Sequence, residues 1–307
     1  MGDLGRTVIS AARSHWAAAT SYQRFLYRVG GLLVLSAGFH FLVMIATGGS
    51  VEGSTSWRKP VLFGEAFGLT AITIGWVMTY LPKRRAIEWA LAGGLAVSTS
   101  YEVVWVSVQQ WRGVPSHFNY STGFDTAAFN TAGTMIFLAA LAALIVTGWS
   151  LFSLSGPASL RLAIRSGLLL LLAGQAFGFA IIENGNSKVF DPQTGEYLPE
   201  AVEQAATFGD AGSMKVPHAL SVHAIQILPA LAGLLSLSQS SERRRWWTVL
   251  VGAVAYASLV AVSASQTFRG LALFDLMPAT VVLFGVSSAG LVGAYAAAIV
   301  GLRPSVN

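Results

Sequence analysis

The run GGLLVLSAGFHFLVMIATG, residues 30–48, decides the fold class of this chain. It contains no Asp, Glu, Lys or Arg, and its only titratable side chain is His40. A transmembrane helix needs about 20 consecutive, mainly apolar residues, and this run has nearly that length. It therefore predicts a membrane span rather than a helix of a soluble core.

The composition of the whole chain agrees with that interpretation. Of its 307 residues, 54% are hydrophobic and only 11% are charged, and the mean hydropathy is +0.60. Soluble domains of this length do not have such a composition, so we expect a multi-pass membrane protein. The net charge of +5 then reflects basic loops rather than nucleic-acid binding. The absence of Cys excludes disulfides, thiolate metal sites and a cysteine nucleophile.

Seven further apolar runs have the length of a span, which predicts an all-α bundle of about eight transmembrane helices over residues 30–301. Residues 1–29 carry several arginines and are expected to form an amphipathic helix on the membrane surface, and 302–307 a short tail. The longest connection is 185–216. The seven further runs are 60–81, 88–108, 126–149, 164–184, 217–238, 246–266 and 277–301.

The distribution of basic residues predicts the orientation. With the N-terminus inside, 13 Lys and Arg residues fall on the inner segments and 6 on the outer ones, which accounts for the 19 in the chain. Cytoplasmic loops carry the excess of positive charge. Both termini are therefore expected in the cytoplasm, and the loop 185–216 on the other side of the membrane.

The polar residues within the spans are concentrated in the half nearer the outer face. An ionisable residue inside a membrane is costly unless it is paired or solvated, so it indicates a functional site by default. We therefore expect an outward-facing chamber. The His, Asp and Glu residues in or beside this half that enter the hypotheses below are His40, Glu65, Glu102, His117, Asp125, His218 and His223.

Two carboxyl groups are candidates for proton transfer. Ser98, Glu102, Trp105 and Gln109 share one face of the span 88–108. Glu102 and Glu65 are the candidate catalytic acids or bases. The alternative is that each is a structural carboxylate paired with a basic residue at the same level of the membrane.

Three histidines and one aspartate form a candidate metal site. His117, His218 and His223, with Asp125, would bind zinc or iron and leave a position for water, whose pKa the metal would lower towards about 7. The alternatives are structural: an interfacial His218, an ordinary loop residue at His117, and an N-cap of the span 126–149 at Asp125. A regular helix separates His218 and His223 by about 140°.

A b-type haem is the alternative cofactor. His40 and His223 lie at similar depth on different spans and would be its axial ligands. The propionates would then meet basic residues of the outer interface, which otherwise anchor spans or hold an anionic headgroup. These basic residues are Arg58, Lys59 and Arg112.

A third hypothesis is a proton-coupled carrier that uses Glu65 and Glu102. It requires polar residues that continue to the inner face, and the inner halves of the spans contain almost none.

Three segments resemble a bacterial family of multi-pass membrane proteins that is uncharacterised. They are SWRKPVLFGE at 56–65, WRGVPSHFNYSTGFD at 111–125 and GDAGSMKVPHALSVHAIQ at 209–226. This resemblance extends over most of the chain and implies a location in the bacterial cytoplasmic membrane.

A second resemblance is to the alkaline-ceramidase-like superfamily of membrane hydrolases, whose members hold zinc with histidines and an aspartate. Ser116, His117, Asp125, His218 and His223 follow one another in the order of that set. The chain departs from the family in having eight spans instead of seven, a histidine pair spaced by five instead of four, and a different interval around His117.

Together these patterns predict a metal-dependent membrane enzyme of the hydrolase type, with metal-dependent oxidation as the other chemistry. Its site would face the extracytoplasmic side. A lipid or small amphipathic molecule would reach a site at this depth from the bilayer. The expected partners are membrane lipids and this substrate.

Overall fold

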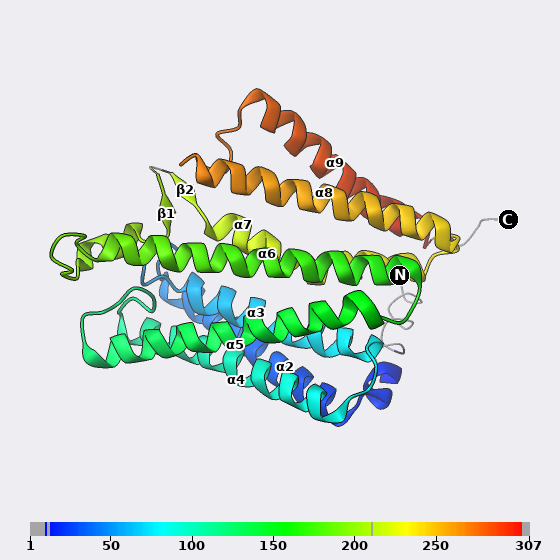
Figure 1. The fold of residues 1–307 in the computed structure, drawn as a ribbon, viewed down its shortest axis with the longest axis horizontal. Helices are drawn as coiled ribbons and strands as arrows, with labels where there is room; N and C mark the ends of the chain where they lie inside the picture. The colour runs from blue at the N-terminus through cyan, green and yellow to red at the C-terminus, as the bar shows by residue number, and fades with distance from the viewer. Residues whose placement is uncertain (1–9, 11–12, 210, 303–307) are drawn as a thin grey trace.

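The computed structural model describes residues 10, 13–209 and 211–302. Within this part of the chain, eight helices are long and apolar enough to cross a membrane, and consecutive helices run in opposite directions (Figure 1). The chain is therefore an all-α, multi-pass membrane protein, as predicted. The helices are α2 (Ser21–Thr47), α3 (Arg58–Val77, extended by the short helix η1, Met78–Tyr80), α4 (Arg85–Arg112), α5 (Gly123–Ser153), α6 (Ala158–Val189), α7 (Lys215–Ser236), α8 (Glu242–Phe268) and α9 (Pro278–Val300).

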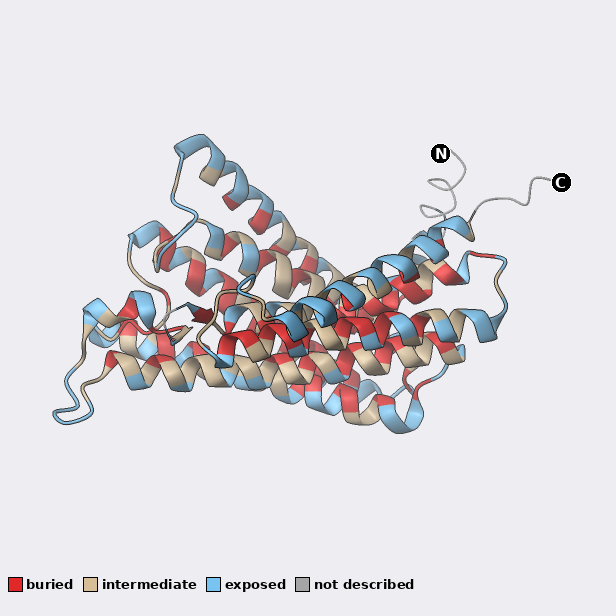
Figure 2. Ribbon diagram, turned by 90° about the horizontal axis from the view of Figure 1, so that it is seen from above, coloured by how far each residue is buried: buried red, intermediate tan, exposed pale blue. Residues whose placement is uncertain are grey.

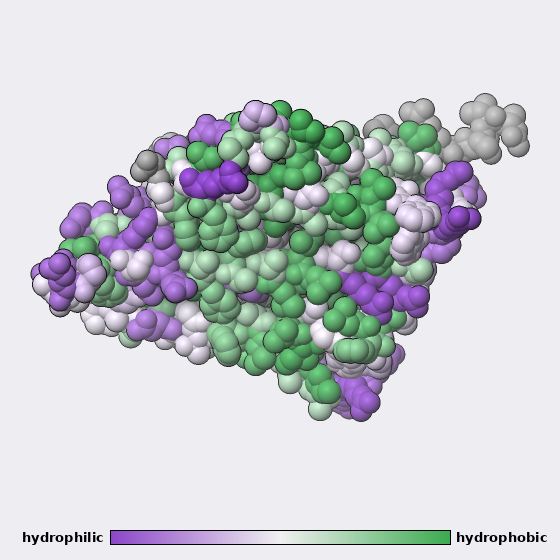
Figure 3. All heavy atoms as spheres, turned by 45° about the horizontal axis from the view of Figure 1, so that its top comes forward, coloured by the Kyte–Doolittle hydropathy of each residue, from purple (hydrophilic) through white to green (hydrophobic). Residues whose placement is uncertain are grey.

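The helices form two groups joined through α6 and α7. Helices α2 to α5 lie on one side of α6, and α8 and α9 lie on its other side (Figure 1). Buried residues gather where the helices face one another, whereas the helix ends and outward faces are exposed (Figure 2). On the face shown in Figure 3, hydrophobic residues cover the middle of the molecule and hydrophilic residues gather towards its two ends. This distribution is the one that a bilayer requires.

The two ends of the bundle differ in their connections. We call the end with the longer connections the loop-rich end and the opposite one the short-loop end. At the short-loop end the helices are joined by 81–84, 154–157 and 237–241. At the loop-rich end they are joined by 48–57, 113–122, 190–214 and 269–277.

The long connection is more ordered than the sequence indicates. Helix α6 continues through 185–189, and the remaining segment contains the short helix η2 (Pro199–Gln204) and a hairpin of β1 (Thr207–Phe208) with β2 (Gly212–Ser213). The side-chain amide of Asn184 holds this segment by donating to two of its backbone carbonyls.

Residues 21–29 were predicted to belong to a surface segment that precedes the first span, but in the structure they are part of the helix that forms this span. These residues are the first turns of α2, which begins with a capping box between Thr20 and Gln23. Tyr22 and Leu26 are buried in the main apolar cluster of the bundle, and this packing explains why the helix starts before the continuous apolar run. Residues 13–18 form a separate helical segment, whereas 1–9 and 11–12 lie outside the described residues.

Small residues bring α2 and α3 into close contact. Gly64 and Gly68 form a GxxxG pair on α3, a spacing that lets two helix backbones approach closely in a membrane. A Cβ atom added at Gly68 would lie 2.7 Å from the carbonyl oxygen of Gly30 on α2, and one added at Gly30 would lie 2.6 Å from that of Gly68. The two helices therefore have no room for a methyl group at this crossing.

Candidate functional site

The polar face of α4 is buried, as the sequence predicts. Ser98, Glu102, Trp105 and Gln109 all point into the protein, and Glu102 is only 2% exposed. A membrane helix that turns its polar face towards its neighbours keeps these groups away from lipid. This face carries Glu102 and the side chains that hold the connection 113–122, so it positions the candidate site.

Two side chains of this face hold the connection 113–122. The indole Nε1 of Trp105 donates to the carbonyl oxygen of Ser116 at 2.9 Å, and Nε2 of Gln109 donates to that of Pro115 at 3.1 Å. Asn119 donates to the same Pro115 carbonyl from within the connection. The connection is thus bound to α4 at successive residues, and its position relative to Glu102 is determined by α4.

A strained residue follows His117 directly. Phe118 has a φ of 58°, a left-handed conformation that costs a residue with a side chain of order 1–3 kcal/mol. Its ring packs on Gly185 of α6, where a Cβ atom would lie 2.2 Å from the ring. Its carbonyl oxygen accepts a hydrogen bond from Tyr197 at 3.0 Å. Contacts from two other segments therefore maintain this conformation.

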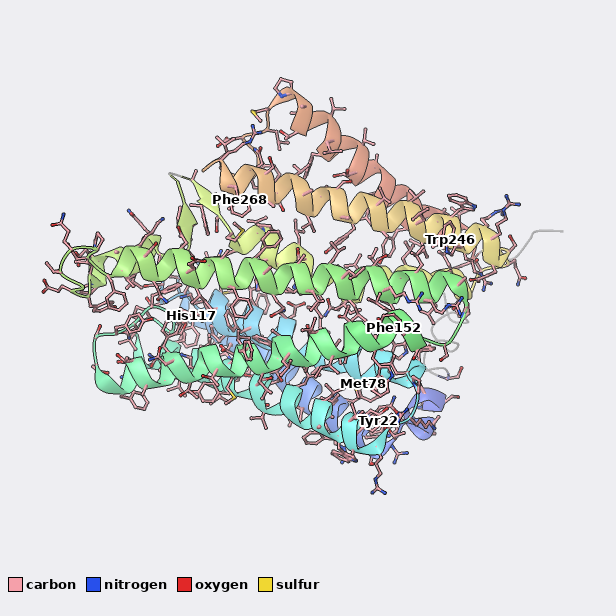
Figure 4. All side chains as sticks on the ribbon, viewed as in Figure 1. Tyr22, Met78, His117, Phe152, Trp246 and Phe268 are labelled. Carbon is pink, nitrogen blue, oxygen red and sulfur yellow. The ribbon has the colours of Figure 1, made fainter. Side chains whose placement is uncertain are left out.

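The ring of His117 is held among aromatic side chains at the loop-rich end (Figure 4). It packs edge-on against Phe63 of α3 and Phe129 of α5, with centroid distances of 5.5 and 5.7 Å. Its Nδ1 lies 2.9 Å from the hydroxyl of Ser116, and Nε2 has no hydrogen-bond partner among the described residues. Burial of the ring, with the positive charges of Lys59 and Lys215 nearby, lowers the pKa of His117 to about 3. His117 is therefore neutral at physiological pH.

Glu102 makes no hydrogen bond to any described residue, and its Oε2 atom is fully buried. Buried polar atoms without a partner are rare, and a buried carboxylate without one would cost several kcal/mol. Such a group is more often part of a functional site than of the packing. Glu102 is the only carboxyl among the described residues that has a fully buried oxygen without a partner.

Glu102 and His117 line the same cavity, which has a volume of about 130 Å³. Its wall comes from α4, α5, α6 and the connection 113–122. The other lining residues are Tyr120, Phe129, Asn130, Ala132, Gly133, Ile136, Ile182 and Asn186.

Tyr120 and Asn186 complete the polar part of this wall. The Tyr120 hydroxyl donates to Oδ1 of Asn186 at 2.9 Å, and burial raises the pKa of Tyr120, so that it remains a protonated donor. No described residue bonds the side-chain nitrogen of Asn186. The cavity thus presents a carboxyl group, a neutral imidazole and an amide to whatever occupies it.

The sequence did not identify Tyr120, Asn130 and Asn186 as site residues. Neutral polar residues are common near helix ends, so their residue types give no signal. The available hints were the polar strings HFNYS, just before α5, and ENGNS, in the last turns of α6.

The predicted metal site is not assembled in the structure. No group of three or more His, Asp or Glu side chains among the described residues is placed to hold a metal ion. His218 instead turns towards α6, where its Nδ1 donates to the carbonyl oxygen of Gly174 at 2.7 Å. Since α7 is a regular helix here, His223 points about 140° away from His218.

Asp125 is engaged in structural contacts, and the prediction that it caps the helix is wrong by three residues. The N-cap of α5 is Thr122, whose hydroxyl oxygen accepts from the backbone N–H of Asp125. The helix starts earlier than its apolar run, so Asp125 falls in the first turn. Its carboxylate accepts from Arg112 at 2.6 Å and from Gln109 at 2.9 Å.

The two predicted haem ligands, His40 and His223, differ in the hydrogen bonds that their rings make. Both ring nitrogens of His40 are occupied, because Nδ1 donates to the carbonyl oxygen of Ser36 at 2.8 Å and Nε2 accepts from Trp111 at 3.2 Å. His223 is half-buried, and no described residue bonds its ring. His40 would have to give up its bond with Trp111 before it could ligate iron through Nε2.

Three further predicted residues, Glu65, Lys59 and Arg58, do not line this cavity. Glu65 is half-buried and bonds no described residue. Lys59 donates to the carbonyl oxygen of Ser54, and Arg58 is exposed at the start of α3. The sequence did not indicate a role for Glu203. Its carboxylate accepts hydrogen bonds from the backbone N–H and the hydroxyl of Ser54, and these bonds hold the pKa of Glu203 below its usual range.

No protein-family model, no curated protein and no solved structure matches the chain.

Proposed function

We propose that the chain is an integral membrane enzyme that performs acid–base chemistry on a small amphipathic substrate in the cavity of Glu102 and His117. The observation that carries this proposal is the buried carboxyl of Glu102, which bonds no described residue and lines a cavity with an imidazole. A proton-transfer group needs access to the substrate and freedom from structural partners, and Glu102 has both.

The two residues would have different tasks. Glu102 would exchange the proton with the substrate as general acid or base. With a pKa of about 3, His117 is a weak base. It would instead bind the substrate's polar group through Nε2, while Ser116 holds the orientation of the ring at Nδ1. Tyr120 and Asn186 would complete the hydrogen bonding of this group.

This assignment shifts the chemistry away from the metal-dependent hydrolysis expected from the sequence. The described residues do not bring three metal-ligating side chains together, whereas they do bring a carboxyl and an imidazole to one cavity. Transfer of an acyl or similar group, with hydrolysis as its simplest form, remains the reaction class that such a pair serves.

The position of the cavity suggests the substrate class and the side of the membrane. The cavity lies near the loop-rich end and is walled by transmembrane helices, so a substrate with a polar head and an apolar part suits it. The basic residues favour the short-loop end as cytoplasmic, since 11 of the 17 Lys and Arg among the described residues belong to that side and 6 to the loop-rich side. We therefore place the cavity on the extracytoplasmic side of a bacterial cytoplasmic membrane.

The proposal is tested by an activity screen on protein purified in mild detergent. Wild-type protein and Glu102→Gln are incubated with total membrane lipid and with a set of amphipathic esters and amides, and products are identified by mass spectrometry. We expect a product whose rate falls by about 10²- to 10⁴-fold in Glu102→Gln.

The matched control is Glu88→Gln. Glu88 is also a buried carboxyl of α4, at the opposite end of the helix and away from the cavity. The control should retain the wild-type rate. Equal rates in the wild type and Glu102→Gln would contradict the proposal.

A further inference from the structure

A second cavity lies on the outside of the bundle, between α2 and α4, and is independent of the proposed active site. It is a groove with a volume of about 620 Å³. The residues that line it are Leu32, Leu33, Ser36, Phe39, His40, Val103, Val104, Ser107, Val108, Trp111 and Arg112.

Most of the groove is apolar and accessible from the bilayer. Leu32 of α2 is 65% exposed and Val104 of α4 is 58% exposed. From Leu32 to His40 the groove follows α2 for about 12 Å, at 1.5 Å per residue. An apolar groove along two membrane helices can accommodate part of an acyl chain.

The polar residues of the groove are gathered towards its loop-rich end. Trp111 donates to His40 there, and Trp111 is half exposed, as is typical of an aromatic residue at the membrane interface. The adjacent Arg112 is the only charged residue among those that line the groove.

Arg112 retains hydrogen-bonding capacity despite its ion pair. Its Nη1 donates to both Asp125 and Gln109, while its Nε and Nη2 groups bond no described residue. The side chain is 39% exposed. A guanidinium with free donors at the headgroup level is suited to an anionic oxygen such as that of a phosphate.

We propose that this groove binds one anionic phospholipid, with an acyl chain between α2 and α4 and the headgroup at Arg112. The apolar length and the single positive charge at the interface end match the two parts of such a lipid. Asp125, the nearest acid to Arg112, is buried on the protein side and therefore does not line the groove.

The proposal is tested by identifying the lipid that the purified protein retains. Wild-type protein is reconstituted with equal parts of phosphatidylglycerol and phosphatidylcholine, transferred to mild detergent, and analysed by native mass spectrometry. We expect one retained lipid per chain, with phosphatidylglycerol preferred by about tenfold, and a preference that weakens as salt is added.

Filling the groove should abolish this retention. Val104→Trp places a large side chain in the groove from α4, and Leu32→Trp does so from α2, so that a folding failure of one variant leaves the other. The matched control is Val254→Trp on α8, because Val254 is also 58% exposed and lies outside the groove.

Loss of the retained lipid in the groove variants, with retention in Val254→Trp, would support the proposal. It would be overturned by undiminished retention in the groove variants, by equal loss in the control, or by the absence of a preference for phosphatidylglycerol. Equal loss in the control would mean that the loss does not depend on the groove, and the absence of a preference would mean that ordinary annular lipid fills it.

Discussion

At the scale of the single residue, Glu102 and His117 differ in how much of their environment can be predicted from the sequence. A carboxyl in an apolar run is conspicuous because burying it is costly, and the sequence alone identified Glu102. The contacts of His117 depend on Phe63 and Phe129, which belong to other helices. The imidazole was therefore identified as a candidate, but its partners could not be predicted.

The depressed pKa of His117 gives a prediction about acid stability. Between pH 6.5 and about 3, an unfolded chain would bind a proton at this residue that the folded protein does not bind. The free energy of unfolding contributed by His117 should therefore be complete above pH 6.5 and decrease as the pH falls through this window. His117→Phe removes this contribution.

The check is thermal unfolding in detergent from pH 7 to pH 4, within the range over which this histidine's protonation should differ between the two states. The melting temperature of wild-type protein should fall more steeply than that of His117→Phe. Glu203 also loses its contribution on acidification, because its pKa is depressed, but it does so equally in both proteins. Parallel curves would show that the His117 ring is accessible to water and protons.

Some polar residues have contacts in the structure that the sequence did not predict, because their partners are distant along the chain. Asp125 and His218 were predicted to bind a metal, yet they bond Arg112 and the backbone of Gly174. Residue type and depth are read from a sequence, whereas the direction of a side chain depends on which helices are neighbours. The same reason explains why Tyr120 and Asn186 were missed.

At the level of the elements, the spans were predicted from hydropathy and their ends were not. Helix α4 runs from Arg85 to Arg112, beyond both ends of its apolar run 88–108. An apolar run corresponds to the hydrocarbon core of the bilayer, and a helix can continue beyond it through charged and amphipathic residues. Residues 21–29 belong to α2 for another reason, because Tyr22 and Leu26 pack in the main apolar cluster of the bundle.

The α2–α3 crossing gives a prediction with an internal control. Gly30→Ala would push a methyl group against the backbone of α3, whereas nothing lies within 4 Å of a Cβ atom at Gly31. We expect Gly30→Ala to lower the free energy of unfolding by about 1–3 kcal/mol. Gly31→Ala should be neutral or stabilising by up to about 1 kcal/mol.

Denaturant unfolding of the two variants in the same detergent measures this difference. If both variants unfold at the same concentration of denaturant, the close approach of α2 and α3 is not present in the membrane protein.

The connection 113–122 depends on Gly185 of α6. Gly185→Ala would displace the Phe118 ring that packs there and so loosen the segment that carries His117. We expect faster amide hydrogen exchange in 114–122, by a factor that corresponds to about 1–3 kcal/mol. Hydrogen exchange followed by mass spectrometry measures this without any substrate.

Gly123→Ala is the control for this experiment, because a Cβ atom at Gly123 meets nothing within 4 Å. It should leave the exchange rates in 114–122 unchanged. An unchanged rate in Gly185→Ala as well would show that Phe118 does not fasten this connection.

On the scale of the whole molecule, the alternation of apolar runs and charged loops was enough to predict an eight-helix bundle. The arrangement of the helices in two groups about α6 and α7 could not be predicted. Which apolar faces pair depends on small residues such as Gly167 and Gly174 of α6, which let α7 approach closely. Hydropathy treats these positions like any other apolar residue.

The orientation in the membrane can be tested directly because the chain contains no Cys. Gln193→Cys lies at the loop-rich end and Gln239→Cys at the short-loop end, and both positions are exposed. In intact cells, a membrane-impermeant maleimide should label Gln193→Cys alone, and permeabilised cells should show labelling of both. The reverse pattern would place the cavity on the cytoplasmic side.

The central claim is that Glu102 serves a ligand in the cavity that it shares with His117. Its most direct measurement is the shift in melting temperature that a library of small amphipathic molecules causes in wild-type protein, Glu102→Gln and Glu88→Gln. We predict compounds that stabilise the wild type and Glu88→Gln equally and lose their effect in Glu102→Gln. Compounds that stabilise all three proteins equally would show that the cavity of Glu102 is not the binding site.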